Sequence, residues 1–106
     1  MEELPNLDYI KELAGDDKDF EQKFITIIKE EFPLERQIYL DHILKDEPRA
    51  AAEIVHKIKH KFNILGLEEA YRFAVAFEEE LHLGNRKMDE DFKAILKKIE
   101  TYLKTI

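Results

Sequence analysis

The 106-residue sequence contains no cysteine, which excludes several kinds of covalent and metal-bound structure. Without thiols the chain forms no disulfide, iron–sulfur cluster or cysteine-ligated zinc site. It also has no apolar run close to the roughly 20 residues needed to span a bilayer. The N-terminal stretch MEELPNLDYI is acidic where a signal peptide is basic and then apolar. We therefore expect a soluble, cytoplasmic protein that does not enter a membrane.

Basic residues are outnumbered by acidic ones, 17 Lys and Arg against 24 Asp and Glu, for a formal net charge of −7. A strongly negative protein repels the phosphates of nucleic acids, so nucleic-acid binding is not expected. The segment Val55–Asn63 differs, because it has no acidic residue and contains a basic island of His56, Lys57, Lys59, His60 and Lys61. Such an island can be a docking surface on an acidic protein. Random variation along a helix surface gives the same pattern.

Glycine and proline are scarce, with three of each, and they fall mostly between stretches of helical periodicity. No segment alternates apolar and polar residues as a strand does, so the predicted class is all-α. We expect a single domain over residues 1–106, an antiparallel four-helix bundle with a short extra N-terminal helix. The predicted helices cover Leu7–Ala14, a long segment after Asp16, Pro48–Gly66, Glu68–Leu83 and Asp89–Lys104. Pro33 lies inside the long segment and predicts a kink or break near Glu30–Phe32.

Apolar residues at helical spacing predict which side of each helix faces the core. In the long helix these are Phe20, Phe24, Ile27, Ile28, Ile38 and either Ile43 or Leu44. In the last two helices they are Ala70, Phe73, Ala74, Phe77 and Leu81, followed by Phe92, Ile95, Leu96, Ile99 and Leu103. The sequence leaves open whether Phe32, Leu34 and Tyr39 belong to the core or to an apolar rim. The acidic run Glu78–Glu80 is interpreted as solvated surface.

The segment Ala50–Leu65 carries the residues of chemical interest. On a helix with about 100° per residue, one side gathers the apolar residues and is predicted to face the core: Ala51, Ile54, Ile58, Phe62 and Leu65. The opposite side is then an exposed stripe of His56, Lys59, His60 and Asn63. An exposed imidazole is to a large extent neutral and nucleophilic near neutral pH. Phosphoryl transfer requires mainly positioning and charge neutralisation, and a lysine one turn along the helix can meet the anionic oxygens.

This helix resembles the signature helix of the histidine-phosphotransfer domains of two-component phosphorelays. The family pattern is a phosphoacceptor histidine, an aliphatic residue two positions on, a lysine three positions on and a glycine that closes the helix. Here these are His56, Ile58, Lys59 and Gly66. The small residues Ala50–Ala52, the mid-helix Pro33 and the acidic stretch Phe77–Leu81 also fit. The resemblance implies that His56 accepts a phosphoryl group and that Lys59 stabilises it.

The resemblance also implies the partners of the chain. It would be a phosphocarrier without kinase activity rather than an enzyme, and we find neither GxxxxGK[ST] nor GxGxxG in the sequence. Receiver domains of response regulators and hybrid histidine kinases would dock on Lys57, Lys61 and Asn63 around His56. The receiver would carry Mg²⁺, so no cofactor is expected on this chain, which is expected to act as a monomer.

His60 departs from the family pattern, which usually has glycine immediately after the lysine. Its imidazole lies one turn from His56 and can either donate a hydrogen bond to the phosphoryl group as an accessory or crowd the partner.

Two other functions fit the same residues. His56 and His60 form a His-x-x-x-His pair, with Glu53 as the nearest carboxylate, although a zinc site needs three or four protein ligands. A helical interaction module that binds partners without phosphotransfer shares every predicted feature of the fold.

Overall fold

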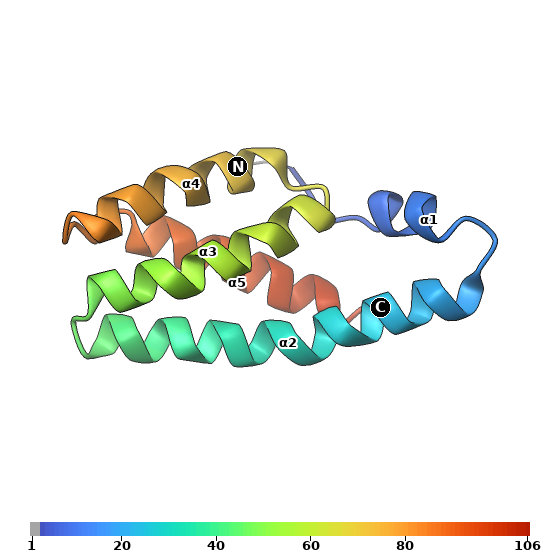
Figure 1. Ribbon diagram of the computed structural model, residues 1–106, viewed down its shortest axis with the longest axis horizontal. Helices are drawn as coiled ribbons and strands as arrows, with labels where there is room; N and C mark the ends of the chain where they lie inside the picture. Colours follow the sequence, from blue (N-terminus) through green and yellow to red (C-terminus); the bar gives the residue numbers. More distant parts are fainter. Residues whose placement is uncertain (1–2) are drawn as a thin grey trace.

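The computed structural model describes residues 3–106, which form five α-helices and no strand. The helices are α1 (Asp8–Ala14), α2 (Lys18–Leu44), α3 (Pro48–Ile64), α4 (Glu68–His82) and α5 (Asp89–Leu103) (Figure 1). The predicted all-α class is confirmed, and α1, α3, α4 and α5 begin and end within about two residues of the bounds expected from the sequence. No helix in the described part of the chain is both long and apolar enough to cross a membrane.

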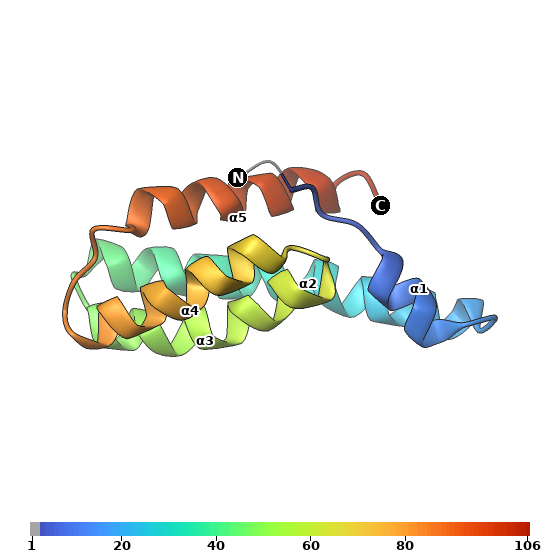
Figure 2. The same ribbon diagram turned by 90° about the horizontal axis from the view of Figure 1, so that it is seen from above.

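The four longer helices enclose a common core. α3 packs against α2 on one side and against α4 on the other, and α5 contacts both α2 and α4. Figure 2 shows α5 on the side of the molecule opposite α3. α1 packs against the N-terminal part of α2, which projects beyond the other helices (Figure 1). The molecule measures 45 Å in length, against 23 Å and 20 Å across. The core therefore lies beneath α3, the helix that carries the candidate site.

α2 is one uninterrupted helix of 27 residues, so of the kink or break expected near Glu30–Phe32 the break is absent. An interior proline costs about 3 kcal/mol through a lost hydrogen bond and a clash with the preceding turn. Burial of apolar side chains on both sides of Pro33 offsets this cost, because Ile28 and Phe32 before it and Tyr39 after it enter the same core. The N-cap of α2 is Asp17, one residue after Asp16, because the Asp17 side chain accepts a hydrogen bond of 3.0 Å from the Phe20 amide.

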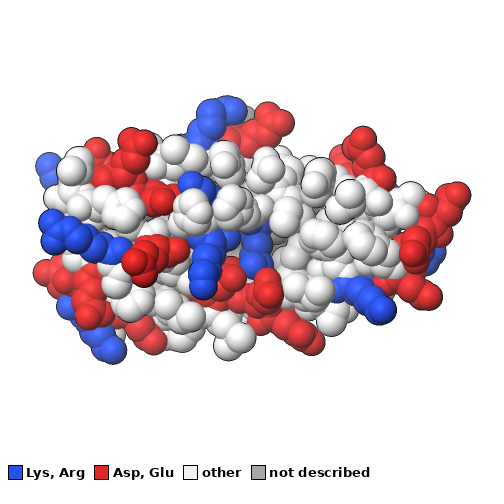
Figure 3. Space-filling view, viewed as in Figure 1, with Lys and Arg blue, Asp and Glu red and all other residues white. Residues whose placement is uncertain are grey.

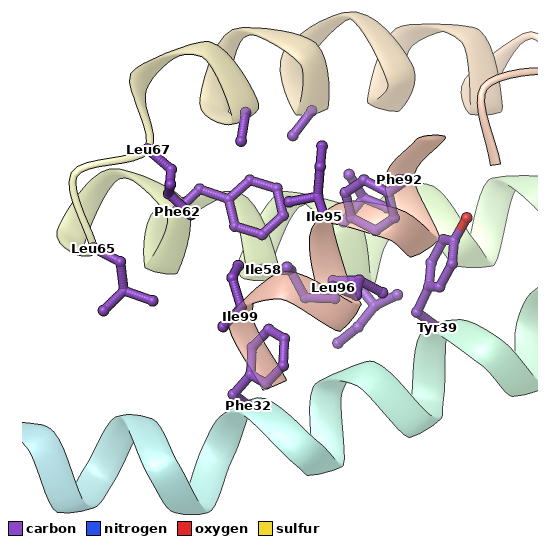
Figure 4. Packing of buried hydrophobic residues seen from close by; sticks show 14 of the residues in the cluster. Phe32, Tyr39, Ile58, Phe62, Leu65, Leu67, Phe92, Ile95, Leu96 and Ile99 are labelled. Atoms are coloured by element: carbon purple, nitrogen blue, oxygen red, sulfur yellow. The ribbon is translucent and has the colours of Figure 1, made fainter. Parts of the chain in front are cut away.

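Aromatic rings fill the centre of the core, where Phe92 of α5 lies within 4.8 Å of Tyr39, 5.1 Å of Phe77 and 5.7 Å of Phe62, measured between ring centroids. Figure 4 shows Tyr39, Phe62 and Phe92 pointing into the space between the helices. The predicted inward face of α5 is confirmed in full, and that of α4 except for Phe73, which is half-buried.

The predicted inward face of α2 is partly wrong. Ile28 is buried as expected, as is Ile43 of the alternatives Ile43 and Leu44, and Phe24 is half-buried. Three other members of the predicted stripe are exposed: Phe20, Ile27 and Ile38. The buried side consists of Ile25, Ile28, Phe32, Tyr39 and Ile43, whereas Leu34 is exposed. Ile27 and Ile38 directly precede the buried Ile28 and Tyr39, so each lies about 100° around the helix from the buried side. Phe20 lies in the N-terminal part of α2 that projects beyond the other helices.

A buried polar pair joins α2 to the start of α5. The Tyr39 hydroxyl donates a hydrogen bond to Asp89, the first residue of α5, whose other carboxylate oxygen lies 2.9 Å from Lys93 Nζ. Burial raises the pKa of Tyr39, and the hydrogen bond to Asp89 raises it further. The hydroxyl therefore stays protonated and available as a donor at neutral and mildly alkaline pH.

Replacing Tyr39 with phenylalanine should lower the free energy of unfolding by about 1–3 kcal/mol, because the buried Asp89 carboxylate loses a hydrogen-bond donor. Urea denaturation at pH 7 measures the change. Tyr9→Phe is the matched control, because the Tyr9 side chain is exposed and should change stability by no more than about 0.5 kcal/mol. Equal stabilities of the two variants would show that Tyr39 contributes only its ring.

Candidate functional site

The core residues of α3 determine how His56 is presented. Ala51, Ile54, Ile58, Phe62 and Leu65 are all buried, as predicted from their shared side of the helix. His56 lies on the opposite side, with 55% of its side chain exposed. His60 and Asn63 are also exposed, so the predicted stripe is confirmed for these three residues.

Lys59 does not belong to the exposed stripe, and the prediction is wrong for this residue. Only 11% of its side chain is exposed, and Nζ lies 2.8 Å from Glu78 Oε1 on α4. Its ammonium group also lies 6.0 Å from the centroid of the Tyr71 ring. The cause is the position of Lys59 on the flank of α3 that meets α4. There its aliphatic part packs against the neighbouring helix while its charge finds a carboxylate.

Glu78 is the central residue of the site, and the sequence interpretation missed it by placing it on solvated surface. Only 17% of its side chain is exposed. Oε2 lies 3.1 Å from His56 Nδ1 and 4.0 Å from His82 Nε2, and Oε1 lies 3.3 Å from His56 Nδ1. One carboxylate thus contacts His56 and Lys59 of α3 and His82 of its own helix. The acidic run gave no signal that distinguished Glu78 from its neighbours, since that distinction depends on how α4 is placed against α3.

The charge state of Glu78 assigns the proton on His56. Burial raises the pKa of Glu78, but the hydrogen bond and charge of Lys59, followed by those of His56, outweigh it and hold the pKa below its ordinary value. Glu78 is therefore ionised at neutral pH and can only accept hydrogen bonds. His56 Nδ1 must then carry the hydrogen that it donates to Glu78, which leaves the lone pair of the neutral ring on Nε2. The arrangement presents a nucleophilic nitrogen to solvent with its ring orientation fixed from behind.

The basic island expected around His56 is not a continuous surface. Lys61 has 10% of its side chain exposed and lies 3.0 Å from both Glu31 and Glu35 of α2. Lys59 and Lys61 therefore point to opposite neighbouring helices, and Lys57 is the exposed lysine of the three. On the face shown in Figure 3, Lys and Arg side chains lie beside acidic ones and form no continuous basic patch. Pairing with α2 and α4 thus removes two of the three predicted lysine charges from the surface.

His60 is exposed next to His56, with ring centroids 5.2 Å apart and ring planes at 87°. Glu53, the carboxylate considered for a metal site with these two histidines, is exposed as well. Within residues 3–106, no group of three or more His, Cys, Asp or Glu side chains converges as metal ligands would. The described geometry therefore gives the His-x-x-x-His pair no third ligand.

Known proteins do not identify this site independently. In comparisons with them, no family model, curated protein or solved structure matches the chain.

Proposed function

We propose that the chain is a histidine-phosphotransfer domain, a phosphocarrier that takes a phosphoryl group from the phosphoaspartate of one receiver domain and gives it to the aspartate of another. The observation that carries this proposal is the exposed His56 ring, whose Nδ1 contacts the ionised Glu78 at 3.1 Å. This contact leaves Nε2 as the nucleophile, in a position that a large partner can reach.

The helix contacts support the fold that belongs to this function. α2, α3, α4 and α5 form a closed cycle of neighbours, and the turns between them are short. Both features fit an antiparallel four-helix bundle, with α1 as the extra N-terminal helix. Such a bundle holds its surface residues on rigid helices, which suits a residue that must enter the active site of another protein.

In the proposed step, the only reacting group that this chain supplies is the His56 imidazole. The Nε2 lone pair attacks phosphorus, the new P–N bond forms, and the P–O bond to the receiver's aspartate breaks. The aspartate leaves as a carboxylate with the bonding electrons. The ring, which keeps its Nδ1 proton, becomes a cation that the Glu78 carboxylate stabilises at 3.1 Å. Attack by the next receiver's aspartate reverses these changes and returns the lone pair to Nε2.

The receiver supplies the remaining chemistry in this proposal. It carries the Mg²⁺ that neutralises the phosphoryl oxygens, and this chain acts as a monomeric cytoplasmic carrier without kinase activity. Lys57 and Asn63 are exposed beside His56 and are suited to docking. Lys61 is suited to it only if its ion pairs with Glu31 and Glu35 open.

Phosphoryl uptake with a site map tests the proposal. The protein is incubated with phosphorylated receiver domains and, separately, with a small phosphoramidate, and the label is located by mass spectrometry under non-acidic conditions. We expect label on His56 and complete loss of it in His56→Gln, with stability changed by no more than about 0.5 kcal/mol because the side chain is exposed. His42→Gln is the control, since His42 also contacts a carboxylate, Glu47 at 3.1 Å, but lies on α2.

The same experiment separates the alternative functions. If several receivers and the phosphoramidate leave His56 unlabelled while circular dichroism shows an intact fold, phosphotransfer is wrong and the chain is a helical interaction module.

A further inference from the structure

A phosphoryl group on His56 brings negative charge that some side chain must meet. Its three oxygens accept strong hydrogen bonds from nearby donors. The resemblance assigns this task to Lys59, but Lys59 Nζ already lies 2.8 Å from Glu78 and only 11% of the side chain is exposed. To reach the phosphoryl group, Lys59 would have to leave a largely buried carboxylate, and separating such a pair is costly.

His60 is the other side chain one turn from His56 that can donate a hydrogen bond, since Glu53 on the preceding turn is a carboxylate, and His60 is exposed. The two rings meet edge to face with 5.2 Å between their centroids. An imidazole carries at least one N–H in every protonation state, so His60 has a donor whether neutral or charged. A separation of 5.2 Å is compatible with a phosphoryl oxygen bridging the two rings, given hydrogen-bond lengths of roughly 2.7–3.2 Å.

We propose that His60 donates a hydrogen bond to the phosphoryl group on His56 Nε2, and that Lys59 instead holds Glu78 in place to orient the His56 ring. This inference rests on the proposed function and assigns the site's charge neutralisation to a residue that the family pattern does not contain. His56 is thus flanked by two groups with separate tasks: Glu78 binds Nδ1 from α4, and His60 meets the oxygens on Nε2 from α3.

Besides His56 and His60, other charged groups lie on α3 and on the two helices that pack against it. On α3 they include Arg49, Glu53, Lys57, Lys59 and Lys61; on α4, Glu78 and His82; and on α2, Glu31 and Glu35. Glu31 and Glu35 are paired with Lys61, and Glu78 is paired with Lys59. Arg49 and Lys57 are the exposed Lys or Arg residues of α3, and Lys57 is already assigned to docking, so Arg49, two turns from His56, is the matched control.

Two measurements test the role of His60. First, phosphoramidate labelling of His56 is followed by ³¹P NMR at pH 7.5 in wild type, His60→Ala, His60→Gln and Arg49→Ala. Loss of one charge-assisted hydrogen bond should slow labelling about tenfold in His60→Ala. His60→Gln should recover part of the rate because its amide is a donor, and Arg49→Ala should stay within about twofold of wild type.

Second, the ring resonances of His60 are followed against pH before and after His56 is phosphorylated. A neighbouring phosphoryl anion favours the charged imidazole, so the His60 titration should move about one pH unit higher, while that of His42 should not move. If His56 is labelled but the His60 titration and the His60→Ala rate are both unchanged, this inference is overturned and the proposed function stands. If His56 takes no label in the folded protein, both are overturned.

Discussion

Replacing Glu78 with glutamine is expected to slow phosphoryl uptake by His56 about 10- to 100-fold, the usual effect of removing a carboxylate that orients a functional histidine. Glutamine keeps the size of the side chain but can no longer require the proton to sit on Nδ1, because its amide both donates and accepts. It also removes the negative charge that stabilises the cationic ring formed in the step. Labelling rates with phosphoramidate measure the change, and Glu79→Gln, at an exposed neighbouring position, should label like wild type.

The same substitution should lower the free energy of unfolding at pH 7 by about 1–3 kcal/mol, since it leaves the Lys59 ammonium largely buried without a carboxylate. The effect should depend on pH in a defined direction. The pKa of Glu78 is lower in the folded protein than its ordinary value of 4.5, so its stabilisation is complete above that value. It is lost as the pH falls through the folded pKa, because protonation then removes the charge in both states.

Urea denaturation of wild type and Glu78→Gln at pH 7 and pH 3 therefore tests the ion pair separately from the chemistry. The difference in stability should be large at pH 7 and smaller at pH 3. A difference that is equal at the two pH values would mean that Glu78 contributes packing rather than charge. A variant that unfolds like wild type but labels slowly would assign Glu78 a purely orienting role.

The orientation of α3 could be predicted because its own residues determine it. Five apolar residues share one side of this helix, and burying them turns His56 and His60 outward whichever helices cover that side. α5 was predictable for the same reason: its apolar residues form one continuous stripe from Phe92 to Leu103. In both helices, amphipathic periodicity alone predicts which side is buried.

The errors in predicting the candidate site concern residues on the flanks of helices, whose surroundings depend on neighbouring helices. Lys59 and Lys61 are polar residues of α3 that become buried because α4 and α2 supply Glu78, Glu31 and Glu35. Nothing in a single helix pattern shows which acid of a distant helix lies opposite a given lysine. The missed Glu78 follows from this limit: periodicity places a residue on its own helix but does not set the register between two helices.

Gly66 lies in the turn between α3 and α4, where the N-terminal segment crosses. Asn6 donates a backbone hydrogen bond of 2.9 Å to Leu65, and its side chain accepts one of 3.1 Å from Asp8 at the start of α1. Three residues earlier, Glu3 accepts bonds of 3.1 Å and 2.7 Å from the amides of Glu69 and Ala70, in the first turn of α4. These bonds satisfy helix-start amides that no local side chain caps. The segment thus ties α1 to the beginning of α4, the helix that carries Glu78.

Gly66→Ala is expected to lower the free energy of unfolding by about 2–3 kcal/mol, for two reasons that add. Gly66 has φ +77°, a left-handed conformation that costs a residue with a Cβ roughly 1–2 kcal/mol. A Cβ there would also lie 2.5 Å from Asn6 Nδ2, so the Asn6 side chain must move and give up its hydrogen bond to Asp8, at a cost of about 1 kcal/mol. Urea denaturation measures the total.

Gly84 provides the control that separates the two causes. It has φ +84°, but a Cβ at this position meets nothing within 4 Å, so Gly84→Ala should show the conformational cost alone. If the contact with Asn6 matters, Gly66→Ala is the more destabilising of the two, and the excess disappears when Asn6 is replaced by glycine in the same protein, because the obstructing side chain is then gone. If Gly66→Ala and Gly84→Ala lose the same stability, the Asn6 side chain moves aside freely, and only the backbone conformation requires glycine in this turn.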